Sequence, residues 1–175
     1  SVFGKSNLKQ VEGFAIYAGK KTEVINLAQT KANTATNNGR QIYAKIAGLN
    51  IWESDAAGIQ LGIGGRGLSP NRTSNFNTRQ NGYDISADAL GYPESYYSPV
   101  PDMVDRIEVI RGASSLQYGT QFGGLVNFKM KRAVADHRLH GMAKYTGGSF
   151  DFYNFTHQLS YGTKKWGVGV SHQYK

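Results

Sequence analysis

The segment from Met103 to Phe128 constrains the fold more than any other part of the chain. Its stretch Arg106–Ile110, rich in Ile and Val, stops at Arg111-Gly112, and small residues follow. Gly123 and Gly124 then open a second apolar stretch. Short apolar runs bounded by glycine are typical of strands. The segment therefore predicts two strands, at 106–110 and 125–130, joined by a turn of small residues.

The rest of the first 132 residues combines short strands with one helix. Further strands are predicted at 22–27, 49–52 and 60–63, and at 75–78 and 83–86 on the two sides of a turn. Asn81-Gly82, between the last two, is a strong signal for a two-residue hairpin turn. A helix is predicted at about 40–47, capped by Asn37-Asn38-Gly39 and ended by Gly48. These elements predict a mixed α+β domain at 21–132, after a flexible leader at 1–20.

The tail has a different pattern, in which large and polar residues alternate. The alternation is clear at 153–161 and 166–174 and weaker at 139–146, with aromatic residues near the ends. Segments of about nine alternating residues match transmembrane barrel strands. They also match a water-soluble antiparallel sheet with one wet face. The pattern by itself leaves both interpretations open.

Charge and cysteine content narrow the chemistry. The chain has 20 basic and 12 acidic residues, a net charge of +8, but no dense basic cluster. This distribution weakens the case for a nucleic-acid partner. Because the chain has no cysteine, disulfides and thiolate chemistry are excluded. No run of about 18 apolar residues is present to cross a bilayer as a helix.

The sequence patterns that could indicate an enzyme are not convincing. Gly62–Gly67 has the spacing of a dinucleotide fingerprint, but Leu68-Ser69-Pro70 is a poor helix start, so we expect a glycine-rich strand end. The chain also has no paired carboxylates with an evident shared cleft and no nucleophile motif, so we expect no catalytic residues.

All four histidines, His137, His140, His157 and His172, lie in the tail. His137 and His140 would lie on opposite faces of a strand. No carboxylate or cysteine completes a ligand set, so no metal site is expected.

The loops hold a more promising set of cationic, amide and phenolic side chains. Such donors suit an anionic chelate, because arginine and amide groups bind carboxylate oxygens and tyrosine adds rigid contact area. The candidate ligand-binding residues are Asn71, Arg72, Asn75, Arg79, Tyr92, Tyr96, Tyr97, Gln117 and Gln121.

Residues 104–128 resemble the plug-domain signature of TonB-dependent outer-membrane receptors, of the form RIEVxRGxxSxxYGxxxxGGxVN. Gly67–Arg72 and Gln80–Asp84 resemble the ferric-citrate-type siderophore receptors. The resemblance implies a globular plug inside a 22-stranded barrel in the outer membrane of a Gram-negative bacterium. Residues 133–175 would then be the first two or three barrel strands, in contact with membrane lipid. Since three strands cannot close a barrel, we expect them to belong to a longer receptor.

The resemblance also implies partners. TonB, with ExbB and ExbD, would pull on a short N-terminal segment, for which the candidate is Val11-Glu12-Gly13-Phe14-Ala15-Ile16. Arg66 and Arg111 would be structural, paired with glutamates on the barrel wall and solvent-exposed without it. No cofactor is expected to bind directly, and the cargo would be an iron chelate. Alternatives are another cargo (cobalamin, another metallophore, an oligosaccharide) or a soluble basic β-rich module that binds nucleic acid or glycan.

Overall fold

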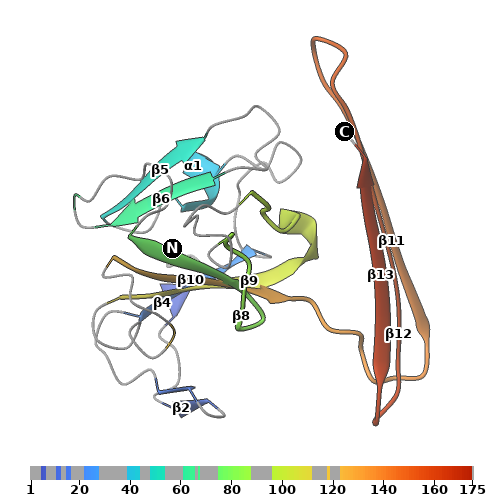
Figure 1. The fold of residues 1–175 in the computed structure, drawn as a ribbon. Coiled ribbons are helices and arrows are strands. Elements are labelled where there is room, and N and C mark those ends of the chain that lie inside the picture. Colours follow the sequence, from blue (N-terminus) through green and yellow to red (C-terminus); the bar gives the residue numbers. More distant parts are fainter. Residues whose placement is uncertain are drawn as a thin grey trace. The chain divides into compact units, whose positions relative to one another are not determined.

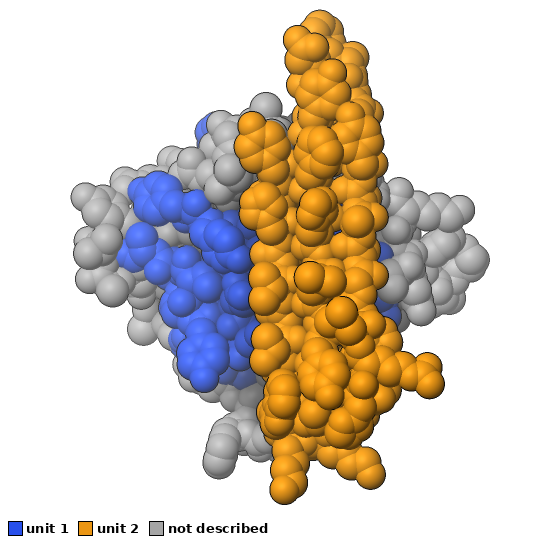
Figure 2. Space-filling model, turned by 90° about the vertical axis from the view of Figure 1, so that its right-hand side faces the viewer, with its two compact units in different colours: residues 1–129 blue, residues 130–175 orange. Residues whose placement is uncertain are grey.

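The computed structural model describes residues 5–6, 11–12, 15–16, 22–27, 39–43, 48–53, 61–65, 67, 75–87, 96–111, 118 and 123–174. The chain divides into two compact units, residues 1–129 and residues 130–175 (Figure 2). Among the described residues, none forms a helix long and apolar enough to cross a membrane.

A six-stranded mixed sheet organises the first unit (Figure 1). Its order is β1 (Lys5–Ser6), β4 (Thr22–Asn26), β9 (Val104–Ile110), β10 (Gly124–Met130), β7 (Phe76–Gln80) and β8 (Tyr83–Asp84). β10 runs parallel to β7, whereas β4 is antiparallel to both β1 and β9. Because it holds a parallel pair together with antiparallel ones, the sheet is mixed.

Smaller elements complete this unit. They are β2 (Val11–Glu12) paired with β3 (Ala15–Ile16), α1 (Gly39–Tyr43), β5 (Leu49–Glu53) paired with β6 (Leu61–Gly65), and the 3-10 helix η4 (Pro101–Met103). Ile42 and Tyr43, on the apolar side of α1, are buried. Gly48, with φ of 74°, adopts the left-handed conformation in which glycine is favoured.

The two faces of the six-stranded sheet differ in chemistry. Residues that alternate along the strands place buried apolar side chains on one face, which we call the apolar face: Ile25, Phe76, Ile107, Val109, Val126 and Phe128. On the opposite face, Ile110 and Leu125 form a small cluster against which Tyr118 packs. Val24, the register partner of Glu108, is also buried on that second face, and polar side chains occupy most of what remains.

The second unit is a three-stranded antiparallel sheet of β11 (Leu139–Gly147), β12 (Tyr153–Gly162) and β13 (Gly167–Tyr174). Register places large residues on one face, which we call the aromatic face, where the ring centroids of Tyr145 and Phe155 are 4.7 Å apart. The exposed large apolar residues of this face are Leu139, Tyr145, Tyr153, Phe155, Leu159, Val168, Val170 and Tyr174. On the other face, which is polar, Lys144, Thr156 and Gln173 lie side by side across the three strands.

Most predicted elements are confirmed within a residue or two. Asn81 and Gly82 have φ of 52° and 89°, the positive values that a two-residue hairpin turn needs. The predicted helix at 40–47 is observed at 39–43, and its caps Asn37 and Asn38 lie outside the described residues. Within the predicted leader, β1 joins the sheet beside β4.

Candidate functional site

Four polar side chains lie in one line across β9, β10, β7 and β8, and we call them the polar row: Glu108, Asn127, Arg79 and Asp84. Asn127 is the register partner of Arg79, which in turn faces Asp84. Asn127 Nδ2 donates to Glu108 Oε2 over 2.8 Å, which links β10 to β9. Glu108 is 0% exposed, so the row carries a carboxylate into the interior.

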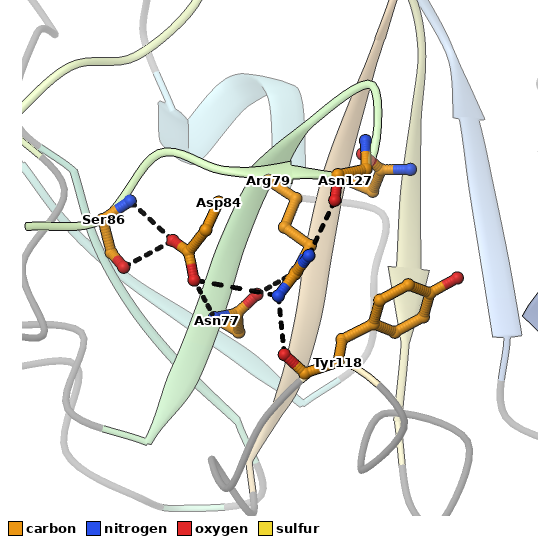
Figure 3. Close-up of polar contacts among 7 residues, drawn as sticks. Asn77, Arg79, Asp84, Ser86, Tyr118 and Asn127 are labelled. Carbon is orange, nitrogen blue, oxygen red and sulfur yellow. Dashed lines mark hydrogen bonds and ion pairs between the residues drawn. The ribbon is translucent and has the colours of Figure 1, made fainter. Parts of the chain in front are cut away.

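Arg79 is held by acceptors within its own unit (Figure 3). Its Nε donates to Asn77 Oδ1 over 2.7 Å, its Nη1 to the Gly82 carbonyl over 2.7 Å, and its Nη2 to the Tyr118 carbonyl over 2.6 Å. The guanidinium carbon also lies 5.1 Å from the centroid of the Tyr118 ring, within the range of a cation–π contact. The side chain therefore fastens the β7–β8 hairpin to the segment at Tyr118.

Asp84 closes the hairpin end of the polar row. Its carboxylate accepts from Asn77 Nδ2 over 3.0 Å and from the Ser86 backbone N over 2.8 Å, and it lies 3.8 Å from Arg79 Nη2. Partial burial by itself would raise the pKa of Asp84. The hydrogen bonds from Ser86 and Asn77, with the charge of Arg79, outweigh burial and lower that pKa below its ordinary value.

At the other end, Glu108 is paired with Arg106. Arg106 Nε lies 3.0 Å from Glu108 Oε1, and Arg106 Nη1 lies 3.2 Å from Asp105 Oδ2. An enclosed carboxylate is stable only when it is paired and hydrogen-bonded, and Glu108 has both kinds of partner. The row thus runs unbroken from an ion pair on β9 to a hairpin carboxylate on β8.

The expectation that Arg111 is solvent-exposed is wrong. Its side chain is 11% exposed, and its Nη2 lies 3.5 Å from Glu23 Oε2 on β4. Glu23 and Arg111 are 88 positions apart in the sequence, so only the pairing of β4 with β9 brings them together. Arg66 lies outside the described residues.

The predicted ligand-binding residues are distributed between described and undescribed parts of the chain. Tyr96 and Tyr97 are exposed at 54% and 48%, and partial burial raises the pKa of Tyr97. The carbonyl of Asn75 accepts a 2.7 Å hydrogen bond from Gly123 N. Arg79 belongs to the polar row. Outside the described residues lie Asn71, Arg72, Tyr92, Gln117 and Gln121.

The candidate TonB segment contains two short paired strands. Val11 pairs with Ile16 and Glu12 with Ala15, so the described part has an extended backbone. Gly13 and Phe14, between the two strands, lie outside the described residues. Contact with TonB stays a prediction.

Residues 17–125 match the family model of the TonB-dependent Receptor Plug Domain. The chain belongs to the TonB-dependent receptor family. The matched region holds Arg79, Asp84 and Glu108 of the polar row, and Asn127 lies two residues beyond its end.

Solved receptors share this architecture. The unliganded ferric citrate transporter FecA is 26% identical, with a TM-score of 0.66 over 87% of this chain and 24% of its own. The siderophore receptor PirA from Acinetobacter baumannii is 19% identical, with a TM-score of 0.67 over 90% and 24%. The copper transporter OprC is 16% identical, with a TM-score of 0.64 over 91% and 24%. The chain spans about a quarter of the length of these proteins, and the last two show the fold alone.

The histidines after the plug are placed differently from one another. His140 lies on β11, and its Nε2 is 2.7 Å from Asp136 Oδ2. His137 precedes that strand with φ of 59°, so the prediction that the two occupy opposite faces of one strand is wrong. His157 and His172 face each other across β12 and β13. In the part of the chain that the structure describes, no three His, Asp or Glu side chains are grouped to hold a metal ion.

Sequence reasoning missed Glu108 and Asn127 as a linked pair. Each is a polar residue between two buried apolar neighbours in a plug strand, and that pattern is a usable signal. A polar side chain in such a strand is buried with its neighbours and needs a hydrogen-bond partner. The sequence does not show which partner, because strand order sets it.

Proposed function

We propose that the chain is the plug and the first barrel strands of an outer-membrane receptor that binds a ferric chelate and imports it with energy from TonB. The observation that carries the proposal is the combination of the plug-family match with 26% identity to the ferric citrate transporter FecA over 87% of the chain. In this proposal the plug, residues 21–132, gates the passage. TonB, driven by ExbB and ExbD, pulls on the leader at 1–20.

The second unit supports an outer-membrane location in a Gram-negative bacterium. β11, β12 and β13 have 9, 10 and 8 residues, close to the roughly 9–11 that a tilted strand needs to cross a bilayer. Their aromatic face exposes large apolar side chains, which suit contact with lipid. We therefore assign residues 133–175 to the start of a transmembrane barrel.

The proposed ligand is an anionic ferric chelate, bound by loop residues of the plug together with the barrel. Tyr96 is available for this role, because it is exposed and lies in a loop between β8 and η4. The double substitution Arg72→Ala, Tyr96→Ala should weaken binding of ferric citrate to the receptor and leave its folding intact. Titration calorimetry together with circular dichroism checks both parts, and unchanged affinity would remove these two loops from the site.

Uptake of radioactive iron tests the whole proposal. Cells with and without the receptor gene are offered ferric citrate, then other ferric chelates, cobalamin and oligosaccharides in separate assays. Loss of ferric citrate uptake in the deletion strain, with the same loss in a strain that lacks TonB, is the expected result. Unchanged ferric citrate uptake with loss of another cargo would retain the receptor and reassign its ligand.

A further inference from the structure

β9 and β10 meet through different chemistry on their two faces. On the apolar face, Ile107, Val109, Val126 and Phe128 are buried. On the opposite face, Ile110 and Leu125 join the strands at one end by an apolar contact. Beside them, Glu108 of β9 and Asn127 of β10 are linked by a 2.8 Å hydrogen bond between wholly or almost wholly buried side chains. The row continues to β7 and β8 through the Gly82 amide, which donates to Asn127 Oδ1 over 2.9 Å.

The order of the strands places this junction between two parts of the sheet. On one side, β9 is paired with β4, and β4 with β1 of the N-terminal leader. On the other side, β10 is paired with β7 and runs directly into residues 130–175. A pull on the leader would load β1, β4 and β9, whereas β10 is continuous with the segment assigned to the barrel.

We infer that the β9–β10 junction at Glu108 and Asn127 is where the plug sheet separates during transport. This inference rests on the proposed function. Hydrogen bonds between polar side chains are exchanged for bonds to water at small net cost, whereas separating apolar side chains exposes them to water without compensation. The Glu108–Arg106 ion pair lies within β9, so it stays intact and regains hydration when β9 leaves β10. The polar row thereby lowers the cost of separation on one of the two faces, and its specific partners restore the register on closure.

Apolar replacement of the pair tests the inference in the full receptor. In the double variant Glu108→Leu, Asn127→Leu the strands keep buried side chains of similar size but lose the polar contact. Arg106 keeps its 3.2 Å contact with Asp105, so its charge retains a partner. We expect ferric citrate affinity and thermal stability no lower than in the wild type. Uptake should fall about ten-fold, which corresponds to about 1.4 kcal/mol of added opening free energy.

Two controls separate polarity from repacking. Glu108→Gln keeps the pair polar and should retain more uptake than the double leucine variant. Ile107→Leu with Val126→Ile repacks the apolar face of the same two strands and should also leave uptake unchanged. If the folded, chelate-binding double leucine variant transports at the wild-type rate, the inference is overturned. If the wild-type receptor imports none of the tested cargoes, the proposed function itself fails.

A second measurement applies if the double leucine variant does not fold. These 175 residues contain no cysteine, so Val126→Cys adds one thiol to them, at a site that is 0% exposed, and labelling is read against the receptor without the substitution. We expect a maleimide to label it in cells only when ferric citrate and TonB are both present. Thr78→Cys should stay unlabelled, because Thr78 lies on β7, which remains paired with β10 when β9 leaves. Absence of labelling at residue 126 under active uptake would also overturn the inference.

Discussion

At the scale of single residues, the arrangement around Arg79 shows how contacts decide a role. The guanidinium donates through all three of its nitrogens to acceptors in the plug, and its side chain is 17% exposed. A guanidinium that is already satisfied in this way has little capacity left for an anionic ligand. Arg79 was predicted as a ligand contact, and the geometry instead supports a role in positioning the hairpin.

Arg79→Ala should lower the free energy of unfolding by about 2–4 kcal/mol, because it removes three hydrogen bonds from a charged donor and leaves their acceptors unpaired. Arg79→Lys keeps the charge but loses the planar fork, so it should recover only part of that loss. Urea denaturation measures both variants. Arg132→Ala, at an exposed site, is the matched control and should change stability by less than about 0.5 kcal/mol. Equal stability of the Arg79 and Arg132 variants would contradict the proposed role of Arg79 in fastening the β7–β8 hairpin to the segment at Tyr118.

Asp84 makes stability depend on pH. Its pKa is lowered in the folded state, so between the folded and unfolded pKa values the unfolded chain binds more protons. The stabilisation from ionised Asp84 is therefore present above its unfolded pKa, about 3.9, and is lost as pH falls through the folded pKa. Asp84→Asn should lower stability at pH 7 and do so less as the pH falls below about 4.

The measurement is urea denaturation of both proteins across this range. Asp151→Asn, at an exposed site with φ of 55° that asparagine also tolerates, should show no such trend. A pH-independent difference between Asp84→Asn and the wild type would contradict the argument.

At the scale of elements, the two strand connections around β7 and β10 use glycine for different reasons. Gly82 has φ of 89° and open space around it, so only its backbone conformation demands glycine. Gly124 has φ of 138°, and an added Cβ would lie 2.6 Å from the Ile110 carbonyl and 2.9 Å from the Phe76 ring. The second glycine therefore also permits close approach of β10 to its neighbours.

Alanine at these two glycines separates strain from crowding. Gly82→Ala should cost about 1–2 kcal/mol of stability, the price of a left-handed residue with a Cβ. Gly124→Ala should cost about 1–3 kcal/mol more than that, because backbone atoms must also move. Chemical denaturation of the two variants gives the comparison directly. Equal losses of stability would show that crowding against the Ile110 carbonyl adds no cost at Gly124.

At the scale of the whole molecule, two units with different chemistry share one chain. The plug unit buries its apolar side chains inside a mixed sheet, whereas the second unit presents them on an exposed face. Such a face needs an apolar partner, and the family to which the chain belongs suggests membrane lipid. The proposal of barrel strands is therefore testable by placing charge on either face of β12.

Leu159 and Gln158 are adjacent on β12 and lie on opposite faces. Leu159→Lys puts a charge on the aromatic face, where it should cost about 2–4 kcal/mol at the bilayer centre and reduce the amount of receptor in the outer membrane. Gln158→Lys, its matched control, should be tolerated. Quantitative immunoblotting of outer-membrane fractions measures both. Equal levels of the two variants would refute contact of the aromatic face with lipid.

Local pattern was enough to predict most strands, the Asn81-Gly82 turn and the alternation in the tail, since these depend on near neighbours in the sequence. Local pattern also indicated the receptor family, because the residues at 104–128 have a specific order and spacing. Strand order decided the rest. The contact of Arg111 with Glu23, the hydrogen bond of Asn127 with Glu108 and the pairing of Asn127 with Arg79 all join residues from segments that are neighbours only in the folded sheet. No local pattern encodes them, because they depend on which strands pair and in which register.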